Sequence, residues 1–292
     1  MMYFFAGATS QTGIAVLERL VSHVGAENVN CLVRPTSITK PLQALGVKLH
    51  VGNVTQPDTF KSLLGSNVTY LDMTHPKHYH ISLQAITGAG VRRAYFVTTT
   101  GIFSKYNQCS EIYKVNEARI RDSGIVYTIL RPTMIYGSAQ DKNMNRLIRF
   151  LDRYPIFPLF GNGQNLMQPV YVDDLADGIA AAIIKPNTEY QEYNLAGFQA
   201  ITYLEVIDTI LRQLNRQVLK IKININLAAT IANYAQHLPG FPITGEQVLR
   251  LQENKDFNIS KANSELGYSP RSFEKGIKSE INAMRLAGII RA

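Results

Sequence analysis

A glycine-rich turn near the N-terminus combines residue types that can bind the pyrophosphate of a dinucleotide. The apolar run YFFA leads into GATSQTG, which opens a helical pattern. Backbone N–H groups at the start of such a helix point at an anion, and the helix dipole favours negative charge there. The contacts that we predict are Gly7, Thr9, Ser10, Gln11, Thr12 and Gly13. Ser10 replaces the middle glycine of the usual pattern and could give its hydroxyl to phosphate; a turn without a ligand is the alternative.

The end of the second expected strand carries a charge that discriminates between the two nicotinamide dinucleotides. An acidic side chain at this point would bind the ribose hydroxyls and repel a 2′-phosphate. The sequence instead reads CLVRPTS, with Arg34 at the strand end and with Ser37 and Lys40 soon after it. A guanidinium group binds phosphate by charge-assisted hydrogen bonds. The predicted cofactor is therefore NADP(H), with NAD(H) less favoured, and the alternative is that Arg34 is an ordinary surface residue.

The elements that position these residues alternate between short apolar strands and amphipathic helices. Such alternation requires crossover connections, and therefore predicts a parallel sheet covered by helices on both faces. We expect an α/β fold, a Rossmann doubly wound parallel sheet with a small C-terminal substrate-side domain. The expected strands are 2–6, 29–33, 46–51, 68–72, 93–99 and 125–132, and the expected helices are 12–24, 59–64, 81–90 and 111–124.

After Tyr136 the pattern changes to a loop-rich region, PIFPLFGNGQN, followed by the strand QPVYV and a helix beginning DDLADGI. We expect a dinucleotide-binding domain over 1–137, to which 164–200 returns, and a smaller lobe formed by 138–163 and 201–292. Asp173 and Asp174 stand at a helix start, where carboxylates cap free amides and complement the dipole. A catalytic pair of carboxylates is the alternative.

Composition and charge restrict the class of partner. The chain of 292 residues has a formal charge of +8 and is 46% hydrophobic, which is typical of a globular protein. Its basic residues are scattered, so we expect a phosphate-bearing small molecule rather than nucleic acid. Arg146, Arg149 and Arg153 recur at helical spacing and either face an anionic substrate or form a solvated helix face.

Targeting signals and cysteine chemistry point to the cytoplasm. No apolar stretch reaches the roughly 20 residues that cross a membrane, and the N-terminus lacks the basic start of a secretory signal. Two cysteines are too few for a disulfide framework. The histidines of THPKHYH have no cysteine or carboxylate partners nearby, so we expect surface or pocket-lining residues and no metal. Apolar helices could pair in a homodimer or serve only the internal core.

Motifs spread over nearly the whole chain carry a family resemblance. With the glycine turn, the segments TILRPTMIYG, FGNGQNLMQPVYVDDLADGI and SKANSELGYSPRSFEKGI occur in an order similar to that of the atypical and extended short-chain dehydrogenase/reductase superfamily. The similarity is to its nucleotide-sugar epimerase/dehydratase and NmrA-like branches. The resemblance implies a Rossmann sheet of about seven strands and a small C-terminal substrate domain.

In that superfamily a Ser or Thr after the fifth strand acts with a YxxxK pair on the next helix. The threonines at 98–100 match the hydroxyl position, with Thr100 the best match, and Tyr113 or the nearby Tyr106 would supply a further polar group. Tyr113 is followed four residues later by Glu117 rather than by lysine. An alignment on that glutamate places Cys109 at the tyrosine position and Tyr113 at the lysine position. Cys109 is then a passive thiol or, alternatively, a nucleophile.

The resemblance implies further cofactor contacts. These are Asn53 and Val54 near the adenine, Thr74 after the fourth strand, Thr98 after the fifth and Pro132 after the sixth. Two functions remain open: an NADP(H)-dependent oxidoreductase or epimerase/dehydratase-like enzyme acting on a small, anionic substrate, or an NADP(H)-binding redox-sensing regulator without turnover. The missing lysine favours the regulator, and the threonines and the segment from GNGQ to VYVDD favour the enzyme.

Overall fold

A seven-stranded parallel sheet forms the N-terminal part of the molecule, as the sequence predicts. The computed structural model describes residues 1–138, 141, 143–235 and 244–291. The strand order is β11-β6-β5-β4-β1-β2-β3, and every neighbouring pair is parallel. The strands are β1 (Met2–Ala6), β2 (Val29–Val33), β3 (Lys48–Val51), β4 (Val68–Asp72), β5 (Arg93–Val97), β6 (Val126–Pro132) and β11 (Gln191–Leu195).

Helices cover both faces of this sheet and enclose two apolar cores. One core lies against α1 (Gln11–Val24) and α6 (Val172–Ile184), and it includes Phe5, Leu17 and Ile179. The other lies against α3 (Tyr79–Gly88) and α4 (Ser110–Arg121), and it includes Phe4 and Phe96. Because the central strands are buried on both faces, they consist of continuous apolar runs rather than alternating ones.

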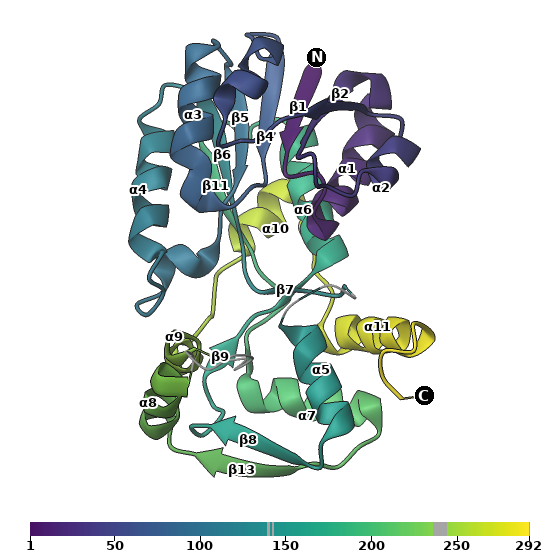
Figure 1. The fold of residues 1–292 in the computed structure, drawn as a ribbon, viewed down its shortest axis with the longest axis vertical. Helices are drawn as coiled ribbons and strands as arrows, with labels where there is room; N and C mark the ends of the chain where they lie inside the picture. The colour runs from purple at the N-terminus through teal and green to yellow at the C-terminus, as the bar shows by residue number, and fades with distance from the viewer. Residues whose placement is uncertain (139–140, 142, 236–243, 292) are drawn as a thin grey trace.

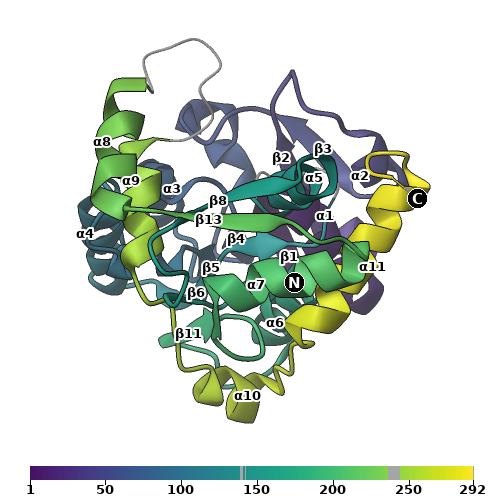
Figure 2. The ribbon, with the colours of Figure 1, turned by 90° about the horizontal axis from the view of Figure 1, so that it is seen from below.

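The C-terminal lobe lies beyond the carboxyl ends of the sheet strands (Figure 1). Its core joins α5 (Met144–Arg153), α7 (Tyr203–Leu214) and α11 (Phe273–Leu286) to the strand β8 (Ile156–Phe160). Figure 2 shows β8 beside β13 (Leu219–Ile223), with which it pairs in parallel. The helices α8 (Ile225–Ala235) and α9 (Gly245–Leu249) pack together on the side of the lobe beneath α4 (Figures 1 and 2).

Further short elements occur in both parts of the molecule. They are β7 (Ile135–Tyr136), which pairs with β10 (Val170–Tyr171), β9 (Leu166–Met167), which pairs with β12 (Ile201–Thr202), α2 (Lys40–Ala44), α10 (Ser260–Leu266) and the 3₁₀ turns Pro76–His78, Thr100–Phe103 and Arg250–Gln252. The helix α10 packs on α6 and contributes Ala262 and Leu266 to the sheet core. The expected domain boundaries stay a prediction. In the part of the chain that the structure describes, no helix is long and apolar enough to cross a membrane.

Three local predictions were wrong. The stretch expected to form a helix over 59–64 instead forms two 3₁₀ turns, Pro57–Thr59 and Lys61–Leu63. Part of the loop-rich PIFPLFGNGQN forms the strand β8. Asp173 and Asp174 do lie in the first turn of α6, but neither side chain caps it. The Asp174 carboxylate instead accepts hydrogen bonds from the backbone N–H and Nε of Arg271.

Candidate dinucleotide and substrate site

The two glycines of the N-terminal turn allow α1 to begin directly against β1. Gly7 has a φ of 95°, and a Cβ at this residue would lie 2.6 Å from the carbonyl oxygen of Met73. A Cβ on Gly13 would lie 2.4 Å from the carbonyl oxygen of Gly7. Neither distance leaves room for a side chain. The turn therefore brings bare backbone to the helix N-terminus, which is the cradle that a pyrophosphate requires.

Ser10 holds this turn together. Its Oγ accepts a hydrogen bond from the N–H of Gly13 at 3.0 Å and donates one to the carbonyl of Gly7 at 3.1 Å, so Ser10 is the N-cap of α1. The hydroxyl predicted to meet phosphate is thus already used within the turn. The N–H groups of Gln11 and Thr12 lie in the first helical turn, where a helix offers no acceptor of its own. Thr9 is half-buried in the same turn.

Arg34 lies at the carboxyl end of β2, next to the glycine turn because β1 and β2 are neighbours in the sheet. The residue is exposed, and its backbone N–H and carbonyl bond to the Oγ and N–H of Ser37. Among the residues that the structure describes, no hydrogen bond or ion pair engages the Arg34 guanidinium. The group is available to a phosphate. Lys40 is exposed nearby as the first residue of α2.

The adenine-side residues are tied into the loop after β3. The side-chain oxygen of Asn53 accepts a hydrogen bond from the N–H of Thr55 at 3.1 Å, which fixes an Asx turn. The side chain of Val54 is buried in the core beneath α3. An adenine contact by Val54 would therefore have to come from its backbone. The adenine contacts of Asn53 and Val54 stay predictions.

A buried carboxylate orients Thr74 after β4. Asp72 is fully buried, and its Oδ1 accepts hydrogen bonds from the N–H of Thr74 at 2.9 Å and from its hydroxyl at 2.6 Å. Burial raises the pKa of the Asp72 carboxyl, and the bonds from Thr74 oppose that rise. Thr74 was predicted from the sequence and Asp72 was not, although an acidic residue that ends a buried strand was a signal for it.

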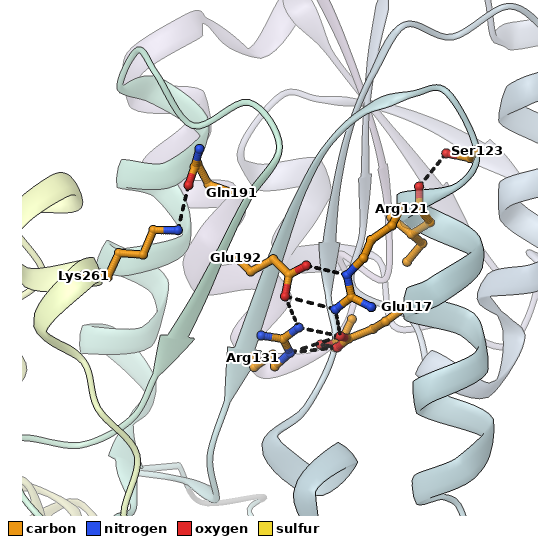
Figure 3. Close-up of polar contacts among 9 residues, drawn as sticks. Glu117, Arg121, Ser123, Arg131, Gln191, Glu192 and Lys261 are labelled. Carbon is orange, nitrogen blue, oxygen red and sulfur yellow. Dashed lines mark hydrogen bonds and ion pairs between the residues drawn. The ribbon is translucent and has the colours of Figure 1, made fainter.

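A buried ion-pair network holds the next strand end (Figure 3). The hydroxyl of Thr98 donates to Oε1 of Glu117 at 2.8 Å, and the same carboxylate accepts a 2.9 Å bond from Nε of Arg131. Arg131 also binds Glu192, and Arg121 bridges both glutamates. Burial alone would raise the pKa of Glu192, but the hydrogen bonds from the two arginines outweigh it and lower the pKa to about 2.

Thr100 faces the end of β6. Its hydroxyl donates to the carbonyl of Pro132 at 3.2 Å, and both residues are buried. Thr99 accepts a 3.0 Å bond from the N–H of Gly101 and caps the 3₁₀ turn that follows. The structure therefore places the three threonines and Pro132 at the carboxyl ends of the neighbouring strands β5 and β6, and their contacts with a cofactor stay predictions.

Tyr113 is a neutral phenol on the side of α4 that faces inward. Burial, and then the neighbouring Cys109, raise the pKa of Tyr113 to about 12, while the charge of Arg250 opposes the rise. Its ring centroid lies 6.1 Å from that of His75, one of the clustered histidines. Among the described residues, no group of three or more histidine, cysteine or acidic side chains is placed to hold a metal. At neutral pH the Tyr113 hydroxyl can donate a hydrogen bond but is not ionised.

Neither Lys114 nor Tyr106 takes the place of the missing lysine. Nζ of Lys114 pairs with Glu111 at 2.6 Å on the exposed side of α4. Tyr106 is 40% exposed, and its backbone N–H bonds to Oε1 of Glu253 at 3.2 Å. That carboxylate also accepts the N–H of Lys105 at 2.6 Å, so it clamps the segment after β5 to the C-terminal lobe. Glu253 could not be identified from the sequence, because a contact between residues almost 150 positions apart leaves no local pattern.

Comparison with known proteins shows which proteins this chain is similar to. Residues 7–149 match the family model described as NAD(P)H-binding. An uncharacterized protein of Sinorhizobium fredii is 31% identical over 53% of this chain and 38% of its own length. The chain spans less than half the length of the first curated relatives that it matches. NAD(P)H azoreductase of Xenophilus azovorans is 24% identical over 78% of this chain and 79% of its own.

The solved structures extend the likeness to the whole chain. The NADPH-dependent quinone oxidoreductase of Escherichia coli, complexed with NADPH, superposes with a TM-score of 0.77 at 20% identity, covering 96% of this chain and 100% of that one. Other similar structures are reductases and nucleotide-sugar epimerases of the same fold. Residues 7–149 thus resemble NAD(P)H-binding domains, and the chain shares its fold with the NADPH-dependent quinone oxidoreductase and with nucleotide-sugar epimerases.

Proposed function

We propose that this protein is an NADP(H)-dependent oxidoreductase that acts on a small molecule bound between the sheet's carboxyl edge and the C-terminal lobe. The observation that carries the proposal is the pair of adjacent strand ends at β1 and β2. The first provides bare backbone at Gly7 and Gly13, and the second provides the free guanidinium of Arg34. Pyrophosphate and 2′-phosphate need these two kinds of group at neighbouring strand ends.

The residues present fit such a cofactor. Gln11 and Thr12 would hold the pyrophosphate through their N–H groups, Arg34 the 2′-phosphate, and Asn53 and Val54 the adenine edge. Thr74, Thr98 and Pro132 border the remaining strand ends, where the nicotinamide would lie. When bound, the dinucleotide supplies or accepts hydride, while the chain binds and orients the reactants.

Thr100 and Tyr113 would position the substrate by hydrogen bonds rather than by taking its proton. A phenol with a pKa of about 12 donates its hydrogen at neutral pH and remains neutral. In Thr100 the hydroxyl hydrogen goes to Pro132, which leaves an oxygen lone pair for a substrate donor. This arrangement suits reduction of an oxidised, electron-accepting substrate, the class named for the azoreductase and quinone oxidoreductase relatives. Tyr106 lies in the clamped segment and would contribute to the pocket wall.

An assay of NADPH oxidation with quinone and azo acceptors tests the proposal. We expect turnover by the wild type, and a loss of about tenfold in kcat for Tyr113→Phe, the effect of one lost hydrogen bond to the reacting molecule. Tyr190→Phe is the matched control, because Tyr190 is exposed and its ring meets that of Tyr127 edge to face. If NADPH binds but neither acceptor is reduced, the proposed activity is wrong.

A second candidate is a redox-sensing regulator that binds NADP(H) without turnover. The observation favouring it is the position four residues after Tyr113, where Glu117 is locked in ion pairs and no lysine is available. Such a regulator would bind NADPH and NADP⁺ with different affinities and reduce no acceptor. Equal affinities together with acceptor reduction would exclude this candidate.

A further inference from the structure

A hollow in the C-terminal lobe is lined by arginines and lies apart from the candidate dinucleotide site. It has a volume of about 600 Å³ and is formed by α5 and by the residues after α11. Its walls include Arg146, Arg149, Arg153 and Arg291, together with Asp152. None of the predicted site residues lines it. The arginines that the sequence singled out therefore line a different surface from the residues predicted to bind the dinucleotide.

The charge of the hollow is strongly unbalanced. Four guanidinium groups face one carboxylate, and that carboxylate is shared, since Arg216 lies 3.9 Å and Arg291 3.8 Å from the oxygens of Asp152. Three of the arginines stand at i, i+3 and i+7 on α5, so their like charges repel one another along one face. A bound anion would relieve this repulsion.

Part of the hollow is already fixed in place. The backbone N–H of Arg291 donates to Oδ2 of Asp152 at 3.3 Å, and Nη2 of Arg291 donates to the carbonyl of Arg153 at 3.4 Å. The guanidinium of Arg153 lies 5.6 Å from the ring centroid of Tyr154. These contacts hold two of the four cationic side chains at the rim, which lowers the entropy lost when a ligand binds.

The other two cationic side chains are available. Arg146 and Arg149 are exposed, and within the described ranges of the chain their guanidinium groups have no hydrogen bond or ion pair. Guanidinium groups bind phosphate oxygens in a bidentate manner and are weakly hydrated, so they suit phosphate recognition better than ammonium groups do. The volume lies within the range of about 300–1,000 Å³ that small-molecule sites occupy.

We propose that this hollow is a second binding site, which takes a small multivalent anion carrying two or more phosphate groups. Arg146 and Arg149 would bind the phosphates, and Arg153 and Arg291 would add two further cationic groups from the same hollow. The site is independent of the proposed oxidoreductase activity, because it shares no residue with the dinucleotide site and no step of the reaction depends on it.

Calorimetric titration with inorganic pyrophosphate, at two salt concentrations, tests the proposal on the full chain. The test variant is the double substitution Arg146→Gln with Arg149→Gln, which keeps helix propensity almost unchanged. Arg119→Gln is the control, since Arg119 is exposed on α4 and outside the hollow. The affinity of the glycine turn for pyrophosphate should be the same in all three proteins. Only the binding that is lost in the double variant therefore belongs to the hollow.

The wild type and Arg119→Gln should bind pyrophosphate at the hollow with the same affinity, and the double variant should bind it there at least tenfold more weakly. Without ligand, all three proteins should have the same melting temperature. Pyrophosphate should also raise the melting temperature less in the double variant than in the other two proteins. Equal affinities in all three proteins would overturn the proposal. An equal loss of low-salt affinity in Arg119→Gln and in the double variant would also overturn the proposal, because it would indicate general charge attraction.

Discussion

The hydroxyl of Thr98 donates a 2.8 Å hydrogen bond to Glu117, a carboxylate only 1% exposed. Glu117 stands four residues after Tyr113, where the superfamily's usual pair has a lysine. The position therefore holds an anion that ties the end of β5 to Arg131 of β6. The helix α4 helps to shape the site by fixing two strand ends, rather than by presenting a cation to a tyrosine.

Substitution of Glu117 should destabilise the fold strongly. In Glu117→Gln the buried Arg131 keeps its charge but loses the more deeply buried of its two carboxylate partners, and breaking a buried pair costs about 3–5 kcal/mol. Because Arg131 still binds Glu192 in this variant, the free energy of unfolding should fall by an amount near the lower end of that range. Urea denaturation at pH 7 measures it through the free energy of unfolding.

Glu111→Gln is the control for this change. Glu111 pairs with Lys114 on the same helix, and both side chains are more than half exposed. An exposed pair contributes about 0–1 kcal/mol, so this variant should unfold almost as the wild type does. Equal losses in the two variants would mean that the network of Glu117 does not stabilise the fold.

The acid Glu280 should make the protein less stable as the pH rises. Glu280 is 2% exposed, and burial, followed by the neighbouring Asp141, raises its pKa to about 9. In the unfolded chain this carboxyl ionises at its ordinary pKa, near 4.5, whereas in the folded protein it stays protonated up to about pH 9. The free energy of unfolding therefore falls progressively between pH 4.5 and about pH 9. Glu280→Gln is neutral and can still accept the 3.1 Å bond from the N–H of Gly137, so it should remove this slope.

Urea denaturation of wild type and Glu280→Gln from pH 5 to pH 9 checks the prediction. The variant should be the more stable protein at pH 9, and the difference should shrink toward pH 5. The exposed Glu189→Gln should follow the wild type throughout. A variant whose stability parallels the wild type at every pH would show that Glu280 is ionised in the fold.

Glu253 should hold the segment after β5 in place. It accepts hydrogen bonds from the N–H groups of Lys105 and Tyr106 and from the hydroxyl of Ser104. In Glu253→Ala, hydrogen exchange at those two amides should be at least about tenfold faster, because each loses a bond to a charged acceptor. Glu246→Ala, in the same region of the lobe, should leave their exchange unchanged, and faster exchange in both variants would argue against a specific clamp.

The sequence was sufficient to predict the sheet and the glycine turn, because their signals are local. The strand ends at Ala6, Val33 and Asp72 follow from continuous apolar runs, and Gly7 and Gly13 follow from the close approach of a helix to a strand. The family resemblance implied a sheet of about seven strands, and the structure has a seven-stranded sheet.

Contacts between distant segments could not be predicted in this way. Glu253 reaches the residues after β5, Arg271 binds Asp174, and Arg291 completes the hollow beside Asp152. Each pair is separated by almost 100 residues or more, and no spacing or composition marks such pairs. Ser10 differs from these pairs, because its contacts are local: its hydroxyl caps α1 and is not left for a ligand.

The central claim is that the glycine turn and Arg34 bind NADP(H), and a titration of the protein with NADPH and with NADH tests it most directly. The wild type should bind NADPH at least tenfold more tightly than NADH, a difference of about 1.4 kcal/mol. Arg34→Ala should remove that preference, and Arg92→Ala, another exposed arginine, should keep it. Equal binding of the two dinucleotides by the wild type would contradict the role of Arg34. Binding of neither at millimolar concentration would contradict the account as a whole.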